Sequence, residues 1–349
     1  MEVDLSALVR NAEALRARAG VPIIPMIKAD AYGLGALQVA AALESLAPLA
    51  YGVATIDEGV ELRDAGIDRE IIVFTPLLDG DFARAREARL TPTLGSARAI
   101  QAWNAYVLPY HLAIDTGMAR AGASWRETGQ LLEAVALHPP AGAFTHFHSA
   151  NLAGPSMSIQ EERFRGVIQQ LSVRPPVLHT DSSAAIVRHD KSPWDAVRPG
   201  IFMYGVGSGE GAGLEPESVV EVKAPIVELR RVEPGDTVSY EATWTAMTQR
   251  VIATISLGYA DGYPRNACEG GTGVVRGFTV PIAGRVTMDM IMLDVTDTGA
   301  EVGDVVTMIG RGSDIGAAID VAAVAAIAGM SPYELLTGLR GRLRRVYRG

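Results

Sequence analysis

The sequence has 349 residues, of which 48% are hydrophobic and 20% are charged, enough to build a barrel-sized domain and a smaller one. Its formal net charge of -9 argues against a nucleic-acid partner, because binding a phosphate backbone needs a basic face. Cys268 is the single cysteine, which excludes an intrachain disulfide and a thiolate metal site and favours a cytoplasmic location.

The first twenty residues predict a helix that ends at Gly20. Acidic residues come first and arginines interrupt the apolar face, which is not the pattern of a signal peptide. No run of 18 uncharged apolar residues follows anywhere in the sequence, so we expect no membrane-spanning segment.

Between residues 22 and 203, short apolar runs alternate with segments of helical period, such as 57–66 and 158–171. This alternation is typical of parallel βα units. Eight strands are predicted, at 22–27, 50–54, 70–75, 90–94, 109–115, 142–147, 176–181 and 196–203. We therefore expect an α/β fold that begins with a (β/α)8 TIM barrel.

From residue 206 the sequence changes to a glycine-rich, polar stretch that predicts a linker, and β-branched runs follow it. These runs predict a mainly antiparallel β-domain, with late helices near 320–329 and 332–340. We divide the chain into a barrel at 1–220 and a C-terminal β-domain at 221–349. The basic stretch 340–349 is read as a solvated tail or helix face.

Polar residues gather at the ends of the predicted strands, where barrel enzymes carry their active sites. They are Lys28, Tyr32, Asp115, Arg120, His146, His148, Asp181, Ser182, Ser183, Arg198 and Gly200. His146 and His148 have metal-ligand spacing, but no further ligand cluster accompanies them, so a zinc site is weakly supported. Ser183, His146 and Asp115 could form a hydrolase triad, but no nucleophile-elbow sequence supports it.

The same set suits a cofactor that has an aldehyde, a phosphate and a ring nitrogen. A lysine can form a Schiff base with the aldehyde, and hydroxyl and backbone N–H groups can hold the phosphate. Pyridoxal phosphate has these three features.

Nine segments resemble the alanine racemase family, in family order and over essentially the whole length. They are IKADAYGLGA, DEGVELRDAGI, LAIDTGMARAG, FTHFHSAN, SSAAIVR, VRPGIFMYG, TVSYEATW, SLGYADGYPR and PIAGRVTMDM. The resemblance implies a barrel followed by a β-domain, and a pyridoxal-phosphate enzyme that interconverts L- and D-alanine for cell-wall peptidoglycan.

The resemblance implies that Lys28 carries the cofactor and then acts as one of two acid/base groups, and that Tyr259 of the partner subunit is the other. Inversion at Cα needs one group on each face, one to remove a proton and the other to return one. A tyrosine would need cationic neighbours to act as a base near neutral pH. The active sites would therefore be shared within a homodimer.

Other positions receive binding roles from the resemblance. His146 and Arg198 connect Tyr259 to the ring nitrogen, which stays unprotonated because an arginine is not expected to give up its proton, and this disfavours transamination. The cofactor phosphate would be held by Tyr32, Ser183, Gly200 and Ile201. Arg120 would bind the substrate carboxylate with the backbone N–H of the partner's Met288. Surface or entry roles are expected for Asp261, Arg265, Arg285 and Asp289.

Three positions depart from the family pattern. Ala113 replaces a carbamylated lysine that orients the carboxylate-binding arginine, so Arg120 is expected to use an anion such as chloride, to use another side chain, or to be more mobile. Gly341 replaces a tyrosine that contacts the phosphate, which would enlarge the pocket. Thr287 replaces a cysteine of the pocket lining.

Three alternatives remain beside alanine racemisation. A roomier pocket would suit a serine or broader-specificity racemase. A decarboxylase of the same plan would be expected to show a glycine-triplet phosphate loop and a catalytic cysteine motif, which are lacking. A non-catalytic cofactor-binding barrel would not need a second domain with Tyr259 and Met288.

Overall fold

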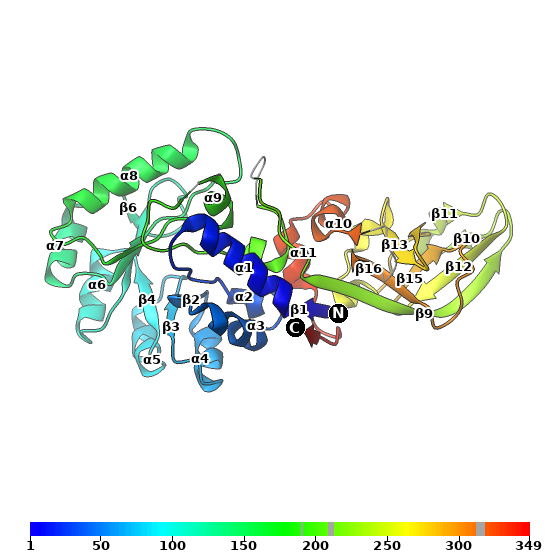
Figure 1. Cartoon of the computed structure of the whole chain (residues 1–349), viewed down its shortest axis with the longest axis horizontal. Helices are drawn as coiled ribbons and strands as arrows, with labels where there is room; N and C mark the ends of the chain where they lie inside the picture. The colour runs from blue at the N-terminus through cyan, green and yellow to red at the C-terminus, as the bar shows by residue number, and fades with distance from the viewer. Residues whose placement is uncertain (190, 209–212, 312–317) are drawn as a thin grey trace.

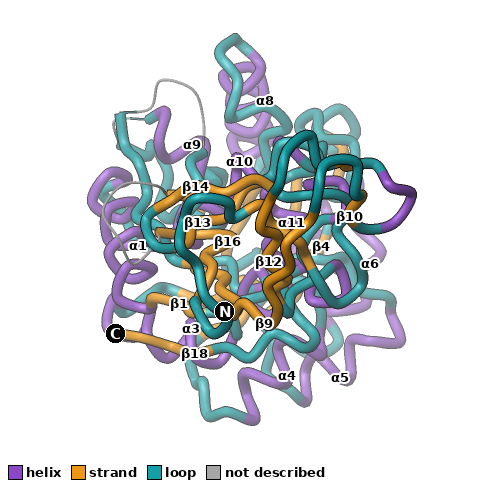
Figure 2. Tube along the Cα trace, turned by 90° about the vertical axis from the view of Figure 1, so that its right-hand side faces the viewer, coloured by secondary structure: helices purple, strands orange, loops and turns teal. Residues whose placement is uncertain are grey.

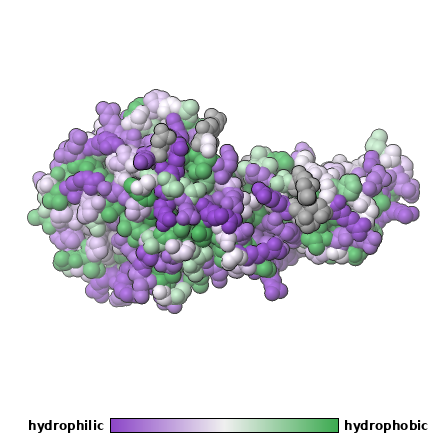
Figure 3. All heavy atoms as spheres, viewed as in Figure 1, coloured by the Kyte–Doolittle hydropathy of each residue, from purple (hydrophilic) through white to green (hydrophobic). Residues whose placement is uncertain are grey.

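A computed structural model describes residues 1–189, 191–208, 213–311 and 318–349. The chain folds into a broad helix-covered body and a narrower extension made mainly of strands (Figure 1). The space-filling view shows the same outline, with hydrophilic and hydrophobic side chains interspersed over both parts (Figure 3). The described part of the glycine-rich connection has no helix or strand, and the predicted linker residues 209–212 lie outside the described residues.

The broad body contains a parallel sheet whose strands follow the order β2-β3-β4-β5-β7-β8, with β6 paired to β5. The strands are β2 (Ala50–Val53), β3 (Glu70–Val73), β4 (Thr91–Leu94), β5 (His111–Asp115), β6 (Ala123–Ser124), β7 (Gly142–Phe144) and β8 (Val177–Leu178). The helices around it are α1 (Leu5–Ala19), α2 (Lys28–Tyr32), α3 (Ala36–Leu43), α4 (Ile56–Asp64), α5 (Phe82–Glu87), α6 (Ala97–Asn104), α7 (Gly129–Leu137), α8 (Ser156–Gln170) and α9 (Ser183–Arg188).

Single bridges, and not full strands, close this sheet into a barrel. Ile23 pairs with Val197, and Met26 pairs with Gly52 of β2. The predicted strand 22–27 is therefore reduced to isolated pairs, because Pro22 and Pro25 have no N–H to donate. The predicted strand 196–203 is likewise too long, since residues from Ile201 to Tyr204 form a 3₁₀ helix.

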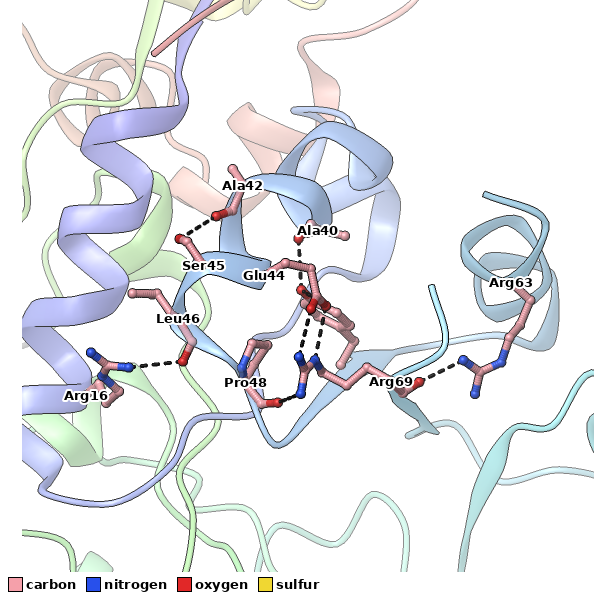
Figure 4. Close-up of polar contacts among 10 residues, drawn as sticks. Arg16, Ala40, Ala42, Glu44, Ser45, Leu46, Pro48, Arg63 and Arg69 are labelled. Carbon is pink, nitrogen blue, oxygen red and sulfur yellow. Dashed lines mark hydrogen bonds and ion pairs between the residues drawn. The ribbon is translucent and has the colours of Figure 1, made fainter. Parts of the chain in front are cut away.

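Local signals in the sequence explain where the barrel helices begin and end. The Asp4 carboxylate accepts the Ala7 N–H at 2.7 Å at the start of α1, and Gly20 ends this helix at a φ of 72°. In the segments that precede β2 and β3, the Glu44 carboxylate accepts from the guanidinium of Arg69, which also donates to the Pro48 carbonyl (Figure 4). These contacts anchor the loops at the amino-terminal ends of the barrel strands.

The extension is an antiparallel sheet built on β9 (Val220–Val232), which runs along its length (Figure 1). Figure 2 views this part end-on and shows β9 beside β12, with which it pairs. The other strands of the second part are β10 (Thr237–Val238), β11 (Trp244–Thr245), β12 (Arg250–Ile255), β13 (Thr272–Val275), β14 (Phe278–Pro281), β15 (Ile291–Asp294), β16 (Val305–Arg311) and β17 (Ala318–Ile319). The late helices are α10 (Val321–Ile327) and α11 (Pro332–Gly338).

Both chain ends join this second sheet, which the sequence did not predict. β1 (Glu2–Asp4) pairs antiparallel with β9 and parallel with β18 (Val346–Arg348). The reading of 340–349 as a solvated tail or helix face is therefore wrong for residues 346–348, which form a strand, although most residues of 340–349 are exposed. The tail is held by strand pairing and by an ion pair of 2.7 Å between Arg348 and Glu2.

Among the described helices, none is by itself long and apolar enough to cross a membrane. α10 and α11 meet the length and composition required only when taken together, and they are bent by 102° at their junction.

Candidate active site

A cavity of about 1,110 Å³ opens at the carboxyl ends of the barrel strands. Its walls contain these predicted site residues: Lys28, Tyr32, Arg120, His146, Ser183, Arg198, Gly200 and Ile201. Sites for small molecules commonly have volumes of about 300–1,000 Å³. The cavity is therefore large enough for a cofactor and a small substrate together.

Lys28 begins a turn with an unusual backbone. The four residues that follow it, 29 to 32, have φ angles of 53°, 55°, 52° and 56°, so α2 is a left-handed turn. Left-handed geometry costs an L-residue about 1–2 kcal/mol. The Glu58 carboxylate offsets part of this cost by accepting the Ala29 N–H at 2.8 Å, and Asp30 does so by accepting the Ala36 N–H at 2.8 Å. Strain of this kind is concentrated at functional sites.

The ε-amine of Lys28 is in an environment that favours its neutral form. Burial lowers the pKa of Lys28, and the positive charges of Arg120 and Arg198 lower it further, while Glu58 opposes the shift. A lysine must be neutral to attack a carbonyl carbon, so this environment suits Schiff-base chemistry.

Arg198 is buried at the floor of the cavity. Its Nη2 donates to the carbonyl oxygens of Thr145 at 2.8 Å and Thr180 at 3.0 Å, and lies 3.4 Å from Nδ1 of His146. Its Cζ lies 5.1 Å from the centre of the Phe144 ring. Burial lowers the pKa of Arg198 to about 9, against the attraction of Asp181, so the guanidinium remains charged at neutral pH.

Two buried histidines, His179 and His111, extend the hydrogen-bond network of Arg198 and were not predicted from the sequence. Arg198 Nη1 lies 2.9 Å from Nδ1 of His179, and Nε2 of His179 lies 2.7 Å from Nδ1 of His111. Burial lowers the pKa of His111 to about 4 and that of His179 well below its ordinary value, so both rings are neutral at pH 7. The signal for them was a histidine inside each of the apolar runs 109–115 and 176–181.

A compact group of donors lies at one end of the cavity. The Ser183 Oγ accepts the N–H of Gly200 at 2.8 Å, so its own proton is free to point into the cavity. A Cβ added to Gly200 would lie 2.7 Å from the Tyr32 Oη, so no side chain fits between them. Tyr32 stacks on Tyr204 with ring centres 4.5 Å apart, and burial raises the pKa of Tyr32. The group therefore presents neutral donors to an anion.

His146 and His148 do not share a metal site. His146 lines the cavity, whereas the exposed His148 places its Nδ1 2.6 Å from the Ser149 Oγ. Burial beside Arg198 lowers the pKa of His146 to about 3. In the described part of the chain, metal-ligand geometry is found instead at Glu161, Asp181 and His189, where the Asp181 carboxylate already accepts from Ser192 at 2.7 Å.

Arg120 follows a tight turn after β5. The Asp115 carboxylate accepts the N–H groups of Gly117 at 2.9 Å and Ala119 at 3.1 Å and so shapes this turn. Arg120 is exposed on the cavity wall, and within the described residues no side chain hydrogen-bonds to it. Ala113 lines the same cavity, and its methyl group supplies no charge to orient Arg120.

Tyr259 and Met288 lie on the second part of the chain, outside this cavity. Tyr259 is 41% exposed and Met288 is 52% exposed. The Tyr259 N–H donates to the Thr287 carbonyl at 3.0 Å, and the next N–H, of Ala260, donates to the Met288 carbonyl at 3.0 Å. The two predicted residues therefore stand side by side on two neighbouring exposed loops, and neither lines the cavity that contains the Lys28 of its own chain.

The late helix α11 supplies part of the cavity wall, a role that was not predicted when the helix near 332–340 was assigned to the C-terminal β-domain. Tyr333, Glu334 and Thr337 line the cavity, and the Tyr333 ring centre lies 6.1 Å from that of Tyr32. Gly341 is not among the lining residues; it has a φ of 80° and lies near the Ala260 carbonyl. A tyrosine of the C-terminal region is thus present at this wall, eight positions before Gly341.

Comparison with known proteins gives one consistent result. Residues 3–208 match the family described as alanine racemase, N-terminal domain, and residues 219–347 match alanine racemase, C-terminal domain. An alanine racemase of Sorangium cellulosum is 36% identical over 372 residues, which cover 99% of this chain and 98% of that protein.

Solved structures agree over the full length. The alanine racemase from Bacillus anthracis with bound L-Ala-P has a TM-score of 0.91 at 31% identity, covering 100% of this chain and 94% of that one. The alanine racemase from Bartonella henselae with covalently bound pyridoxal phosphate has a TM-score of 0.90 at 27% identity, covering 99% and 98%. The predicted barrel followed by an antiparallel β-domain is confirmed by these structures.

Proposed function

The chain belongs to the alanine racemase family, and we propose that Lys28 and the partner subunit's Tyr259 are the two bases with which it interconverts L- and D-alanine. One observation carries this proposal. The cavity gathers Lys28, Arg198 and the donors around Gly200, whereas Tyr259 is exposed on the second part of the chain. A complete pair of bases then requires a second copy of the chain.

The residues around the cavity fit pyridoxal phosphate. Lys28 would bind it covalently, and Arg198 would face the ring nitrogen. Tyr32, Ser183 and the N–H groups of Gly200 and Ile201 would hold the phosphate, which would then take the Gly200 N–H from the Ser183 Oγ. The cradle at Gly200, which a Cβ would fill, matches the close approach of a phosphate to the backbone. When bound, the cofactor withdraws electrons from the amino-acid Cα and makes its proton acidic enough for side-chain bases.

The two bases act on opposite faces of the substrate. Nζ of Lys28 removes a proton on one face when it is neutral and returns one when it is protonated, and the hydroxyl of the partner's Tyr259 serves in the same two ways on the other face. Arg198 keeps its own proton, because its N–H groups are committed to the carbonyl oxygens of Thr145 and Thr180 and to His179. It therefore restrains proton transfer to the ring and favours racemisation over transamination.

Arg120 would bind the substrate carboxylate through its planar fork of donors, together with the backbone N–H of the partner's Met288. Its exposure on the cavity wall supports this role. The proposed functional division is residues 1–220 for the barrel and 221–349 for the β-domain that completes the partner's site. We also propose that the homodimer is cytoplasmic and supplies D-alanine for peptidoglycan.

The alternative of a serine racemase rested on Gly341, which does not line the cavity, so this alternative is now supported only by the cavity volume of about 1,110 Å³. The experiment is to incubate the cofactor-loaded protein with a panel of L-amino acids and to separate the products by chiral chromatography. We expect D-alanine as the main product and a smaller amount of D-serine. A protein that leaves L-alanine unchanged would contradict the proposed function.

A further inference from the structure

Arg342 joins the two loops that carry Tyr259 and Met288. Its Nε lies 3.0 Å from Oδ1 of Asp261 and its Nη2 lies 3.1 Å from Oδ2 of the same carboxylate. Its Nη1 lies 2.7 Å from Oδ1 of Asp289, and Nη2 also lies 3.4 Å from the Met288 carbonyl oxygen. One guanidinium thus binds two carboxylates, one of them in a bidentate manner.

Both carboxylates lie close to the proposed functional residues Tyr259 and Met288 in the sequence. Asp261 is two residues after Tyr259, is buried, and accepts the N–H of Gly258 at 2.9 Å. Asp289 follows Met288 directly. A Cβ on Gly258 would lie 2.2 Å from the Met288 carbonyl oxygen, so the two loops touch through their backbones. A shift of Asp261 would therefore move both Tyr259 and Met288.

The segment that carries Arg342 also forms part of the barrel cavity. α11 lines the cavity with Tyr333 and Thr337, and Arg342 lies four residues after this helix ends at Gly338. A Cβ on Gly262 would lie 2.1 Å from the Gly338 carbonyl oxygen, so the segment packs closely on the turn that contains Tyr259. Residues 333–342 thus run from the wall of the cavity in their own subunit to the turn that carries Tyr259 for the cavity of the partner subunit.

We propose that Arg342 is a positioning residue that fixes Tyr259 and Met288 for the active site of the partner subunit. This inference rests on the proposed role of Tyr259. Removal of Arg342 leaves the buried Asp261 carboxylate without its cation and close to a second carboxylate, so the turn moves. A displacement of about 1 Å in a catalytic group can lower a rate by about 100-fold.

The test uses the cofactor-loaded protein and the variants Arg342→Ala, Arg342→Lys and Tyr259→Phe. Arg340→Ala is the matched control, because Arg340 is exposed in the same segment and its side chain makes no hydrogen bond within the described residues. Two reactions are measured in D₂O: inversion of alanine, and deuterium exchange at Cα without inversion. Hydrogen exchange of the backbone amides at 256–263 is measured in parallel.

With Arg342→Ala we expect inversion to fall by about 100-fold, while Lys28 still exchanges the Cα proton of one enantiomer, as in Tyr259→Phe. Cofactor content and its absorption spectrum should be unchanged, and the amides at 256–263 should exchange faster. Arg342→Lys should lose about tenfold, because an ammonium cannot form the bidentate contact. Arg340→Ala should behave as the wild type.

Wild-type inversion and wild-type amide exchange at 256–263 in Arg342→Ala would overturn the proposal. An equal loss of inversion and Cα exchange, with faster amide exchange in barrel peptides as well, would also overturn it, because that result indicates general unfolding. If Tyr259→Phe retains inversion, the proposed function of Tyr259 fails instead. The amide exchange of 256–263 then still decides whether Arg342 holds the turn.

Discussion

Arg198 Nη1 lies 2.9 Å from His179 Nδ1, and this contact fixes the protonation of two further side chains. A guanidinium can only donate, so Nδ1 of the neutral His179 must accept and its proton must be on Nε2. This proton is donated to Nδ1 of His111, at 2.7 Å, so the proton of His111 is on Nε2. That nitrogen lies 3.8 Å from a carboxylate oxygen of Glu70 at the start of β3.

We predict that His111→Phe destabilises the protein. The variant removes the acceptor for the Nε2–H of His179, and a buried donor without a partner costs about 1–3 kcal/mol. Urea unfolding monitored by circular dichroism measures the change in the free energy of unfolding. His148→Ala is the control, since His148 is exposed, and its effect should stay within about 0.5 kcal/mol. An equal effect of the two substitutions would contradict the assigned network.

Stability should decrease as the pH falls from about 6.5 to about 4. The folded pKa values of His146 and His111 are lowered from 6.5 to about 3 and about 4, so the unfolded state binds more protons in this window. Each such histidine then contributes about 1.4 kcal/mol per pH unit to the slope of the unfolding free energy. Urea titrations at several pH values measure this slope, which should be smaller in His111→Gln than in the wild type.

Gly200→Ala should weaken cofactor binding by at least about tenfold, which is about 1.4 kcal/mol. The added Cβ would lie 2.7 Å from the Tyr32 Oη and displace that hydroxyl. Gly166→Ala is the matched control, because a Cβ there meets no atom within 4 Å, and in α8 it should stabilise the protein by about 0.5–1 kcal/mol. Fluorescence titration with pyridoxal phosphate measures the affinity. Equal affinities in the two variants would refute the proposed close approach of the cofactor phosphate to Gly200.

Arg120 has no partner side chain among the described residues, and Ala113 brings no charge. We therefore predict that chloride helps to orient Arg120 for the substrate carboxylate. Replacing chloride by gluconate at constant ionic strength should raise KM for alanine several-fold and change kcat by less than about twofold. A KM that does not depend on chloride would rule this out.

The sequence predicted the barrel well, because alternating apolar and helical segments report βα units directly. It missed β1 and β18, since strands of three residues have no readable period and their pairing joins the two ends of the chain. It also missed the left-handed turn after Lys28, because alanine and tyrosine, which make up three of its four residues, rarely adopt a positive φ.

The candidate site was predictable where residues follow barrel strands. Lys28, His146 and Arg198 come together because the carboxyl ends of parallel strands meet at one face. Tyr333 and Arg342 gave no such signal. They come from the C-terminal segment, and only the packing of α11 against the barrel places Tyr333 in the cavity wall.

The most direct test of the shared active site mixes two inactive subunits. Lys28→Ala lacks one base and Tyr259→Phe lacks the other. A heterodimer of the two contains one site with both native groups, because the barrel of the Tyr259→Phe subunit receives Tyr259 from its partner. Tagged heterodimers are purified and assayed for alanine racemisation. We predict about half of the wild-type activity per dimer, whereas confirmed heterodimers no more active than either parent variant would contradict the account.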